Sequence, residues 1–386
     1  MDNLKLITDK IHQIYGTEEF VALHSPCFMG NERKYLNDCI DSTYVSSVGV
    51  YVDKFEQMIT EYTGAKAAVA CVNGTNALHM AMMLVGVEKG DEVLTQAVTF
   101  IATCNAISYI SAEPVFIDVD LDTMGLSPVA LSSWLKANAE VREGQCFNRV
   151  TKRRIKACVP MHTFGHPCKI DKIVEICSAY HIEVVEDAAE SLGSFYKEKH
   201  TGTFAKVGVI SFNGNKTITT GGGGMMIFQD EKLAKLAKHL TTQSKIPHKW
   251  EFVHDNIGYN YRMPNINAAL GCAQIENIEN FVRNKRETAN MYQEFFEKID
   301  SIDYFTEPEN CRSNYWLHSI ILKDRSRRDQ FLEFTNSNGV MTRPIWTLMS
   351  KLSMFGQCQN DGLKNSLWLE DRVVNTPSSV RLTEIK

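Results

Sequence analysis

Seven short apolar segments alternate with helical stretches between about Gly64 and Phe228, and this alternation constrains the fold of the 386-residue chain more than any other feature. Such a pattern is typical of a mostly parallel sheet covered by helices on both faces. Predicted helices begin near Thr75, Phe100, Ile170 and Glu231. The predicted strands are 67–72, 92–94, 114–117, 155–159, 182–185, 207–212 and 225–228. We therefore expect an α/β three-layer sandwich.

The sequence pattern changes after about Ser244. A polar stretch, 244–265, precedes a long helical pattern over 266–297. A separate strand, 315–322, and a helix, 329–338, follow. We predict two domains: residues 1–244 hold the N-terminal segment and the large sheet, and residues 245–386 form a smaller C-terminal α/β domain.

The charge distribution and the cysteine content of the chain exclude some classes of function. The net charge is −5, and the basic residues are scattered among acidic ones, which argues against nucleic-acid binding. The first 16 residues have helical apolar spacing, unlike a secretory signal, and we find no apolar run of membrane-span length. The 11 cysteines are dispersed in mostly apolar contexts. We expect a reduced, cytoplasmic, globular protein.

Two segments imitate metal sites. The run MHTFGHPC, 161–168, offers two histidines and a cysteine, but no second ligand pair at zinc-site spacing accompanies it. The aspartates of 118–122 resemble the start of a calcium loop, but that loop's glycine and its bidentate glutamate are missing. We predict no metal.

The strongest chemical signal is Lys216, which lies in SFNGNKTITTGGGG, 211–224, directly after a predicted buried strand. A lysine on such a loop can hold an aldehyde cofactor covalently. Upstream, Asp187 follows another apolar strand, where a carboxylate can hold a protonated pyridine nitrogen. Together the two residues predict pyridoxal phosphate. The alternatives are a solvated surface lysine, and an aspartate that only caps the following turn.

A phosphate seat is predicted at NGTNAL, 73–78, where a strand ends and a helix begins. Gly74 lets the backbone turn, Thr75 can cap the helix, and Ser211 can add a hydroxyl. Phe100 can stack on the pyridine ring, and Glu190 can contact the ring hydroxyl. Ordinary helix capping and a core phenylalanine are the alternatives.

With these segments identified, the chain resembles the DegT/StrS family of sugar aminotransferases, which have the type I, aspartate aminotransferase-like fold of pyridoxal phosphate-dependent transferases. The resemblance spans nearly the whole chain. The matching segments, in family order, are VSSVGVYVDKFEQMITEYTG, VNGTNALHMAM, DEVLTQAVTFIAT, PVFIDVD, VVEDAAESLGS, SFNGNKTITTGGGG, GYNYRMPNINAALGCAQ and GVMTRPIW.

The resemblance implies roles for single residues. Lys216 would be the Schiff-base lysine and Asp187 the partner of the pyridine nitrogen. Phe100 would be the stacking ring, with Gly74, Thr75 and Ser211 as phosphate ligands. Asn260 matches an asparagine that reaches the cofactor phosphate of the neighbouring subunit, which implies a homodimer with shared active sites. Glu190 stands where many relatives have Gln or His, and its carboxylate would repel the cofactor's phenolate unless it is protonated or turned away.

The resemblance also implies the reaction. The family moves an amino group, usually from L-glutamate, to a keto group of a nucleotide-linked sugar. Residues 23–49 resemble a subgroup acting on UDP-2-acetamido-2,6-dideoxy-hexos-4-ulose, on routes to legionaminic acid-type sugars of lipopolysaccharide or O-antigen. The candidate substrate residues, for each of which ordinary packing is an equal alternative, are His24, Pro26, Asn31, Ser46, Ser47 and Arg343.

Two other functions fit a chain of this kind. One is a cofactor-dependent sugar dehydratase, as some relatives are, in which histidine replaces the lysine; Lys216 argues against it. The other is a non-catalytic regulatory protein of the same fold, against which Lys216 and Asp187 both argue.

Overall fold

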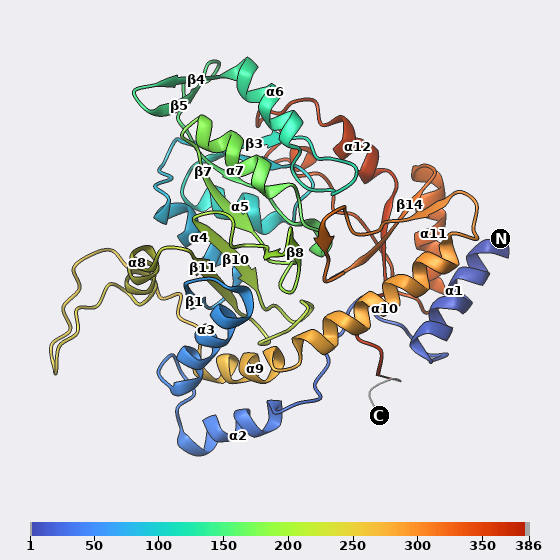
Figure 1. Ribbon diagram of the computed structural model, residues 1–386, viewed down its shortest axis with the longest axis horizontal. Coiled ribbons are helices and arrows are strands. Elements are labelled where there is room, and N and C mark those ends of the chain that lie inside the picture. The colour runs from blue at the N-terminus through green and yellow to red at the C-terminus, as the bar shows by residue number, and fades with distance from the viewer. Residues whose placement is uncertain (1, 383–386) are drawn as a thin grey trace.

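The computed structural model describes residues 2–382, and a seven-stranded sheet forms its centre (Figure 1). The strands are β1 (Ala67–Cys71), β2 (Glu92–Gln96), β3 (Glu113–Ile117), β6 (Ile155–Val159), β7 (Glu183–Asp187), β10 (Val207–Ser211) and β11 (Gly224–Phe228). They lie in the order β1-β11-β10-β7-β6-β2-β3. Only β11 runs antiparallel to its two neighbours. Each of the seven predicted strands overlaps one of these.

Helices cover both faces of the sheet, because alternate strand residues point to opposite sides. Val69, Val209 and Met226 pack in the core on one face, whereas Ile210 and Met225 belong to the core on the other. The first face is covered by α4 (Gly74–Leu84), α5 (Ile101–Tyr109) and α8 (Glu231–Thr241). The second is covered by α3 (Val50–Thr63), α6 (Pro128–Asn138), α7 (Ile170–Ala179) and α9 (Asn265–Ile275). The predicted α/β three-layer sandwich is confirmed.

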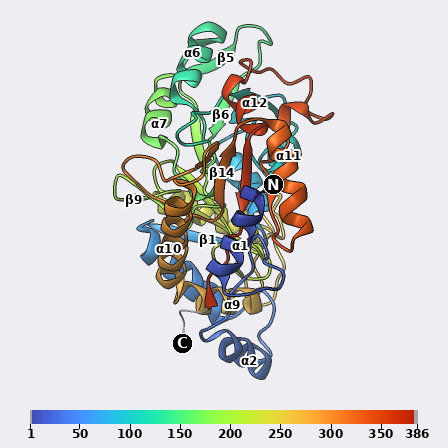
Figure 2. The same ribbon diagram turned by 90° about the vertical axis from the view of Figure 1, so that its right-hand side faces the viewer.

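A second, four-stranded sheet in the order β12-β14-β16-β15 lies in the C-terminal half. Its elements are β12 (Ile302–Tyr304), β14 (His318–Leu322), β15 (Arg343–Pro344), β16 (Val373–Thr376) and the helices α10 (Ile278–Phe296), α11 (Arg325–Ser337) and α12 (Lys364–Glu370). The first helix, α1 (Asp2–Tyr15), packs on this sheet, with Ile7 and Ile11 against Phe331 and Val374. Figure 2 shows α1 beside α11. The division at residue 244 stays a prediction.

The helix predicted over 266–297 is two helices, α9 and α10, separated at Glu276 and Asn277. The two have different partners: α9 packs on α3 and on α2 (Glu32–Ser42), whereas α10 contacts β12. Buried Gln274 donates from Nε2 to Glu32 Oε1 at 2.7 Å, and this bond ties the end of α9 to α2. The chain therefore changes direction where its packing partner changes, and the apolar spacing does not reveal the break.

No helix within residues 2–382 combines the length and the apolar composition that crossing a bilayer requires.

Gly208, the second residue of β10, offers a test of the packing that positions the site. A Cβ at this position would lie 2.0 Å from the backbone oxygen of Gly202. We expect Gly208→Ala to lower the free energy of unfolding by about 1–3 kcal/mol, because backbone must move to admit the methyl group. The matched control is Gly356→Ala, where the nearest atom to the added Cβ is 3.6 Å away. Equal denaturant midpoints for the two variants would contradict the packing.

Candidate active site

The carboxyl ends of several strands open into one cavity of about 380 Å³. In such sheets ligands bind where the strands end. The cavity brings together seven of the predicted site residues: Gly74, Thr75, Phe100, Asp187, Glu190, Ser211 and Lys216. Thr103, Met161, Asn213, Asn215, Trp316 and Trp346 line it too, and sequence reasoning missed them. Thr103 could have been found, because it lies one helical turn after Phe100.

Lys216 points into this cavity from the turn after β10. Its backbone N donates to Asn213 O at 3.0 Å, which closes the turn. Its Nζ lies 3.2 Å from Glu190 Oε1, and the two side chains are only 12% and 1% exposed. The same Nζ lies 3.8 Å from the centre of the Trp316 ring. Lys216 is therefore an enclosed amine, and the alternative of a solvated surface lysine is wrong.

Glu190 is held between Lys216 and the backbone of a neighbouring turn. Its Oε2 accepts a hydrogen bond from Phe164 N at 2.9 Å, and its Oε1 faces Lys216. Burial raises the pKa of Glu190 to about 7, although the positive charge of Lys216 acts in the opposite direction. The carboxyl group is therefore able to gain or lose a proton near neutral pH.

Asp187 ends strand β7 and is fully enclosed. Its Oδ2 accepts from Thr103 Oγ1 at 2.7 Å, and its Oδ1 accepts from Ala189 N at 3.2 Å. The alternative that Asp187 caps the following turn therefore holds for Oδ1, which accepts from Ala189 N, but not for Oδ2. Burial raises the pKa of Asp187, while the hydroxyl of Thr103 and the charge of Lys216 counteract the shift. The residue is thus a buried carboxylate fixed in orientation at the cavity wall.

The start of α4 forms another part of the cavity wall. Asn73 is the capping residue, since its side chain accepts from Asn76 N at 2.8 Å. The prediction that Thr75 caps this helix is wrong, because the helix begins one residue before Thr75. Gly74 lies against Ser211: a Cβ at Gly74 would be 3.1 Å from Ser211 Cβ. Helix amides and a hydroxyl therefore meet at the site predicted for phosphate.

Phe100 precedes α5, lines the cavity and is 50% exposed as a residue. Trp346 lies nearby, with 6.3 Å between the two ring centres. An apolar face left open in the cavity can stack on a flat ring. The alternative of a core phenylalanine is therefore wrong.

Seven predicted residues do not line the cavity. Asn260 is exposed and pairs with Thr242, the residue that follows α8, and its Oδ1 accepts from Arg262 Nε at 3.3 Å. The remaining six are His24, Pro26, Asn31, Ser46, Ser47 and Arg343. Their roles stay predictions.

Three of the six residues proposed for substrate, Ser46, Ser47 and Arg343, have ordinary surroundings, whereas both ring nitrogens of His24 are buried without a hydrogen-bond partner among the described residues. Ser46 and Ser47 lie in the loop between α2 and α3, and Ser46 O accepts from the backbone N of Asn265 at 2.5 Å. Arg343 is exposed on β15, where it donates to Asn336 Oδ1 at 3.0 Å. His24 is half-buried; burial lowers the pKa of its ring well below the usual range, and the nearby positive charges of two lysines add to the shift.

The part of the chain that the structure describes contains no group of three His, Cys, Asp or Glu side chains arranged to hold a metal ion. In MHTFGHPC, His162 Nε2 lies 3.1 Å from Glu186 Oε2, and His162 Nδ1 accepts from Cys168 N at 3.2 Å. His166 packs edge-on against Phe305. These side chains are part of the packing of the fold.

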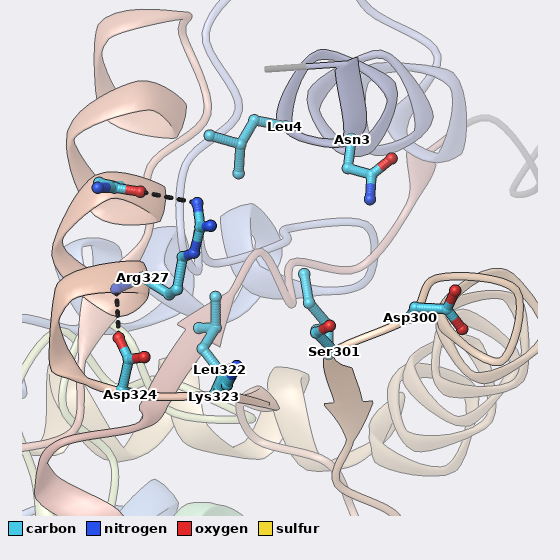
Figure 3. A pocket seen from close by; sticks show the side chains of 10 residues that line it. Asn3, Leu4, Asp300, Ser301, Leu322, Lys323, Asp324 and Arg327 are labelled. Carbon is cyan, nitrogen blue, oxygen red and sulfur yellow. Dashed lines mark hydrogen bonds between the residues drawn. The ribbon is translucent and has the colours of Figure 1, made fainter.

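A larger hollow of about 590 Å³ lies between α1 and α11, beside β12 and β14 of the second sheet and not among the residues at the strand ends of the central sheet (Figure 3). Asp324 in its wall caps α11 by accepting from the backbone N of Arg327 at 2.9 Å, and Arg327 donates to Gln330 at 3.2 Å. The side chains of Asp324 and Arg327 therefore make hydrogen bonds within α11. We therefore place the active site in the smaller cavity at the strand ends.

Comparisons with known proteins agree with the resemblance seen in the sequence. The profile of the DegT/DnrJ/EryC1/StrS aminotransferase family matches residues 26–386. GDP-perosamine synthase of Escherichia coli O157:H7 is 35% identical over 339 residues, 88% of each chain. GDP-perosamine synthase of Caulobacter vibrioides is 32% identical over 369 residues, 94% of each. The crystal structure of the aminotransferase TlmJ from Streptoalloteichus hindustanus matches with a TM-score of 0.85 over 95% of each chain, at 26% identity.

The raised pKa of Glu190 predicts a pH dependence of stability. In the unfolded chain this carboxyl ionises near its ordinary pKa of 4.5, whereas in the folded chain it keeps its proton up to about pH 7. Between these values the folded state binds more protons, so the free energy of unfolding falls as pH rises. Glu190→Gln should remove up to about 1.4 kcal/mol per pH unit of that slope.

Denaturant unfolding of the cofactor-free protein at several pH values measures this slope. Glu61→Gln, a change on α3 at a side chain bonded to Gln57, is the control and should leave the slope as in the unaltered protein. If the free energy of unfolding changes with pH by the same slope in the Glu190→Gln variant and in the unaltered protein, the pKa of Glu190 is not raised by folding.

Proposed function

This chain belongs to the DegT/DnrJ/EryC1/StrS aminotransferase family and is a pyridoxal phosphate-dependent nucleotide-sugar aminotransferase; we propose that it moves the amino group of L-glutamate to the 4-keto group of a nucleotide-linked 2-acetamido-2,6-dideoxy-hexos-4-ulose. The observation that carries the proposal is the enclosed Lys216 amine in one cavity with the buried Asp187 carboxylate and the open N-terminus of α4.

The residues of the cavity fit pyridoxal phosphate. Phosphate would be held by the first amides of α4 with Thr75 and Ser211. The ring would stack on Phe100, and its nitrogen would meet Asp187, the buried carboxylate oriented by Thr103. The aldehyde carbon would be within reach of Lys216. When bound, the cofactor draws electrons away from the substrate carbon that loses its proton.

The chain's own groups then act on protons and charge. With the cofactor bound, Lys216 Nζ would take a proton from the substrate carbon and later give it back, which is general acid–base catalysis. Asp187 would place a negative charge beside the ring nitrogen and so favour the protonated ring. Glu190 Oε1, 3.2 Å from Lys216 Nζ, can hold a proton while the lysine is neutral. Trp316 and Trp346 add apolar rings to the lining of the cavity.

The nucleotide is proposed on the sequence of residues 23–49, whose resemblance is to enzymes of UDP-linked sugars. Two relatives are named for GDP-perosamine, and this similarity favours a GDP-linked 4-keto sugar as the second candidate. Both candidates share the chemistry of a keto group on a hexose attached to a nucleoside diphosphate. We propose that the amino sugar enters surface polysaccharide, and that the enzyme acts in the cytoplasm, as its 11 free cysteines suggest.

We further propose a homodimer with shared active sites. Asn260 lies outside the cavity of its own chain, so that its matched role requires the cavity of a partner. The segment after α8, at the left of Figure 1, projects from the body of the molecule. Within it Trp250, Phe252 and Ile257 are 72%, 79% and 82% exposed. Apolar side chains exposed in this way are typical of a surface that another chain covers.

The substrate proposal is tested by product analysis. The purified protein is incubated with pyridoxal phosphate, L-glutamate and, in turn, UDP-linked and GDP-linked 4-keto-6-deoxy sugars. We expect an amino sugar and 2-oxoglutarate in equal amounts with the UDP-linked N-acetyl sugar. An amino product from the GDP-linked sugar alone would replace the nucleotide assignment. Loss of ammonia without an amino-sugar product would indicate the dehydratase, and no reaction with any amino donor would indicate a non-catalytic protein.

Asp187→Asn tests the electrostatic role of the buried carboxylate. The amide keeps the shape of the side chain and can still accept from Thr103, but it carries no charge. We expect the half-reaction with L-glutamate to slow by about 100-fold or more, because a charge that stabilises the developing electron density is lost. Rapid-mixing absorbance measures this rate, and equilibrium dialysis measures cofactor retention, which should change much less. Asp171→Asn, remote from the cavity, is the control; equal half-reaction rates for both variants would contradict the role.

A further inference from the structure

A short segment of the C-terminal half, residues 313–316, contacts both loops that carry the cavity's charged groups. It joins β13 (Cys311–Arg312) to β14 and includes Asn314 and Trp316. Neither residue stands in the motifs that identify the cofactor site. Both are buried: Asn314 has no exposed surface, and Trp316 is 4% exposed. Their contacts show what the segment does.

Trp316 contacts the Lys216 loop at two consecutive residues. Its indole Nε1 donates to the backbone oxygen of Asn215 at 2.6 Å. The face of the same indole lies 3.8 Å from Lys216 Nζ. An aromatic face attracts an ammonium group, most strongly where water is excluded. One side chain thus fixes both the backbone that presents the lysine and the position of the lysine's nitrogen.

Asn314 links this contact to the Glu190 loop. Its Nδ2 lies 2.9 Å from the backbone oxygens of Glu190 and Leu192 and 3.1 Å from Thr217 Oγ1. Its Oδ1 accepts from the backbone N of Trp316 at 2.8 Å. Because Thr217 follows Lys216 directly, one buried amide connects the Glu190 turn, the Lys216 turn and the backbone of Trp316.

The segment itself has little room to move. A Cβ at Gly165 would fall 1.9 Å from Asn314 Oδ1, so the backbone approaches closely only because residue 165 is glycine. Ser313 Oγ donates to Gly165 O at 3.0 Å, and Asn314 N donates to Ser194 Oγ at 2.9 Å. Tyr315 has a φ of +47°, a conformation uncommon outside glycine that only well-fixed surroundings maintain. The segment is therefore able to act as a rigid support.

We propose that Trp316 is a positioning residue for Lys216, and that Asn314 couples this support to the Glu190 turn. The C-terminal half of the chain thereby sets the place of the amine that the N-terminal half presents. The inference rests on the proposed function in one respect, that Lys216 is the amine which the cofactor engages. A purely structural tryptophan would contribute to stability alone.

The experiment compares Trp316→Phe, which keeps an aromatic face and loses the indole N–H, with Trp316→Leu, which loses both. Trp368→Phe, on α12 and 38% exposed, is the matched control. For each protein, borohydride reduction at set times after adding pyridoxal phosphate, followed by peptide mass spectrometry, gives the rate of linkage to Lys216. The steady-state constants kcat and KM are measured with the amino acceptor that gives product, and thermal unfolding records the folded fraction.

We expect Trp316→Leu to lower the rate of linkage and kcat by about 100-fold, because a misplaced nucleophile loses most of the benefit of orientation. KM for the nucleotide sugar should change less than threefold. Trp316→Phe should lose less. We expect its rate of linkage and its kcat to stay roughly tenfold below those of the unaltered protein, because phenylalanine lacks the indole N–H that donates to Asn215. Trp368→Phe should behave as the unaltered protein.

Three results would overturn the inference: linkage by the Trp316→Leu variant as fast as in the unaltered protein, losses of rate that follow the unfolded fraction, or a Trp316→Phe variant as slow as Trp316→Leu while equally folded. Failure of the proposed function gives a different result, since the unaltered protein itself would then show no linkage at Lys216 or no amino product.

Discussion

The structure of the cavity depends on one constraint: the amine of Lys216 is enclosed inside the protein and needs partners there. A buried ammonium group is costly unless it is paired, and Lys216 has a carboxylate at 3.2 Å and an aromatic face at 3.8 Å. The partner carboxylate, Glu190, is itself buried, and it needs the backbone N–H of Phe164 to satisfy its second oxygen. Each partner comes from a different part of the chain. The fold must therefore bring these segments together before any cofactor chemistry can begin.

The topology of the central sheet provides this convergence. Strands β7 and β10 are parallel neighbours, so Asp187 and the turn with Lys216 emerge at the same edge. Strand β11 returns antiparallel between β10 and β1, and its first residue, Gly224, would place a Cβ 2.4 Å from the backbone of Asn73. The absence of a side chain there lets α4 begin close to the lysine turn. The start of α4 and the amine of Lys216 thus line one small cavity.

Much of this arrangement could be predicted from the sequence, because it depends on local patterns. Apolar runs mark the seven strands, and the rule that chemistry gathers at strand ends brings Gly74, Asp187 and Lys216 together. Spacing alone did not distinguish Asn73 from Thr75 as the helix cap, since either side chain can fill that position. The break between α9 and α10 depends on packing partners distant in sequence. Trp316 gave no signal, because its contacts with Asn215 and Lys216 span about a hundred residues.

Lys216 is the residue that we propose holds the cofactor, and identification of the linked peptide tests this role. The purified protein, loaded with pyridoxal phosphate, is reduced with borohydride, digested and examined by mass spectrometry, with Lys206→Ala and Lys216→Ala variants treated in the same way. Lys206 is an exposed lysine paired with Glu183. We expect one modified peptide, containing Lys216, that persists in Lys206→Ala and is absent from Lys216→Ala. Modification at another lysine, or none in the unaltered protein, would contradict it.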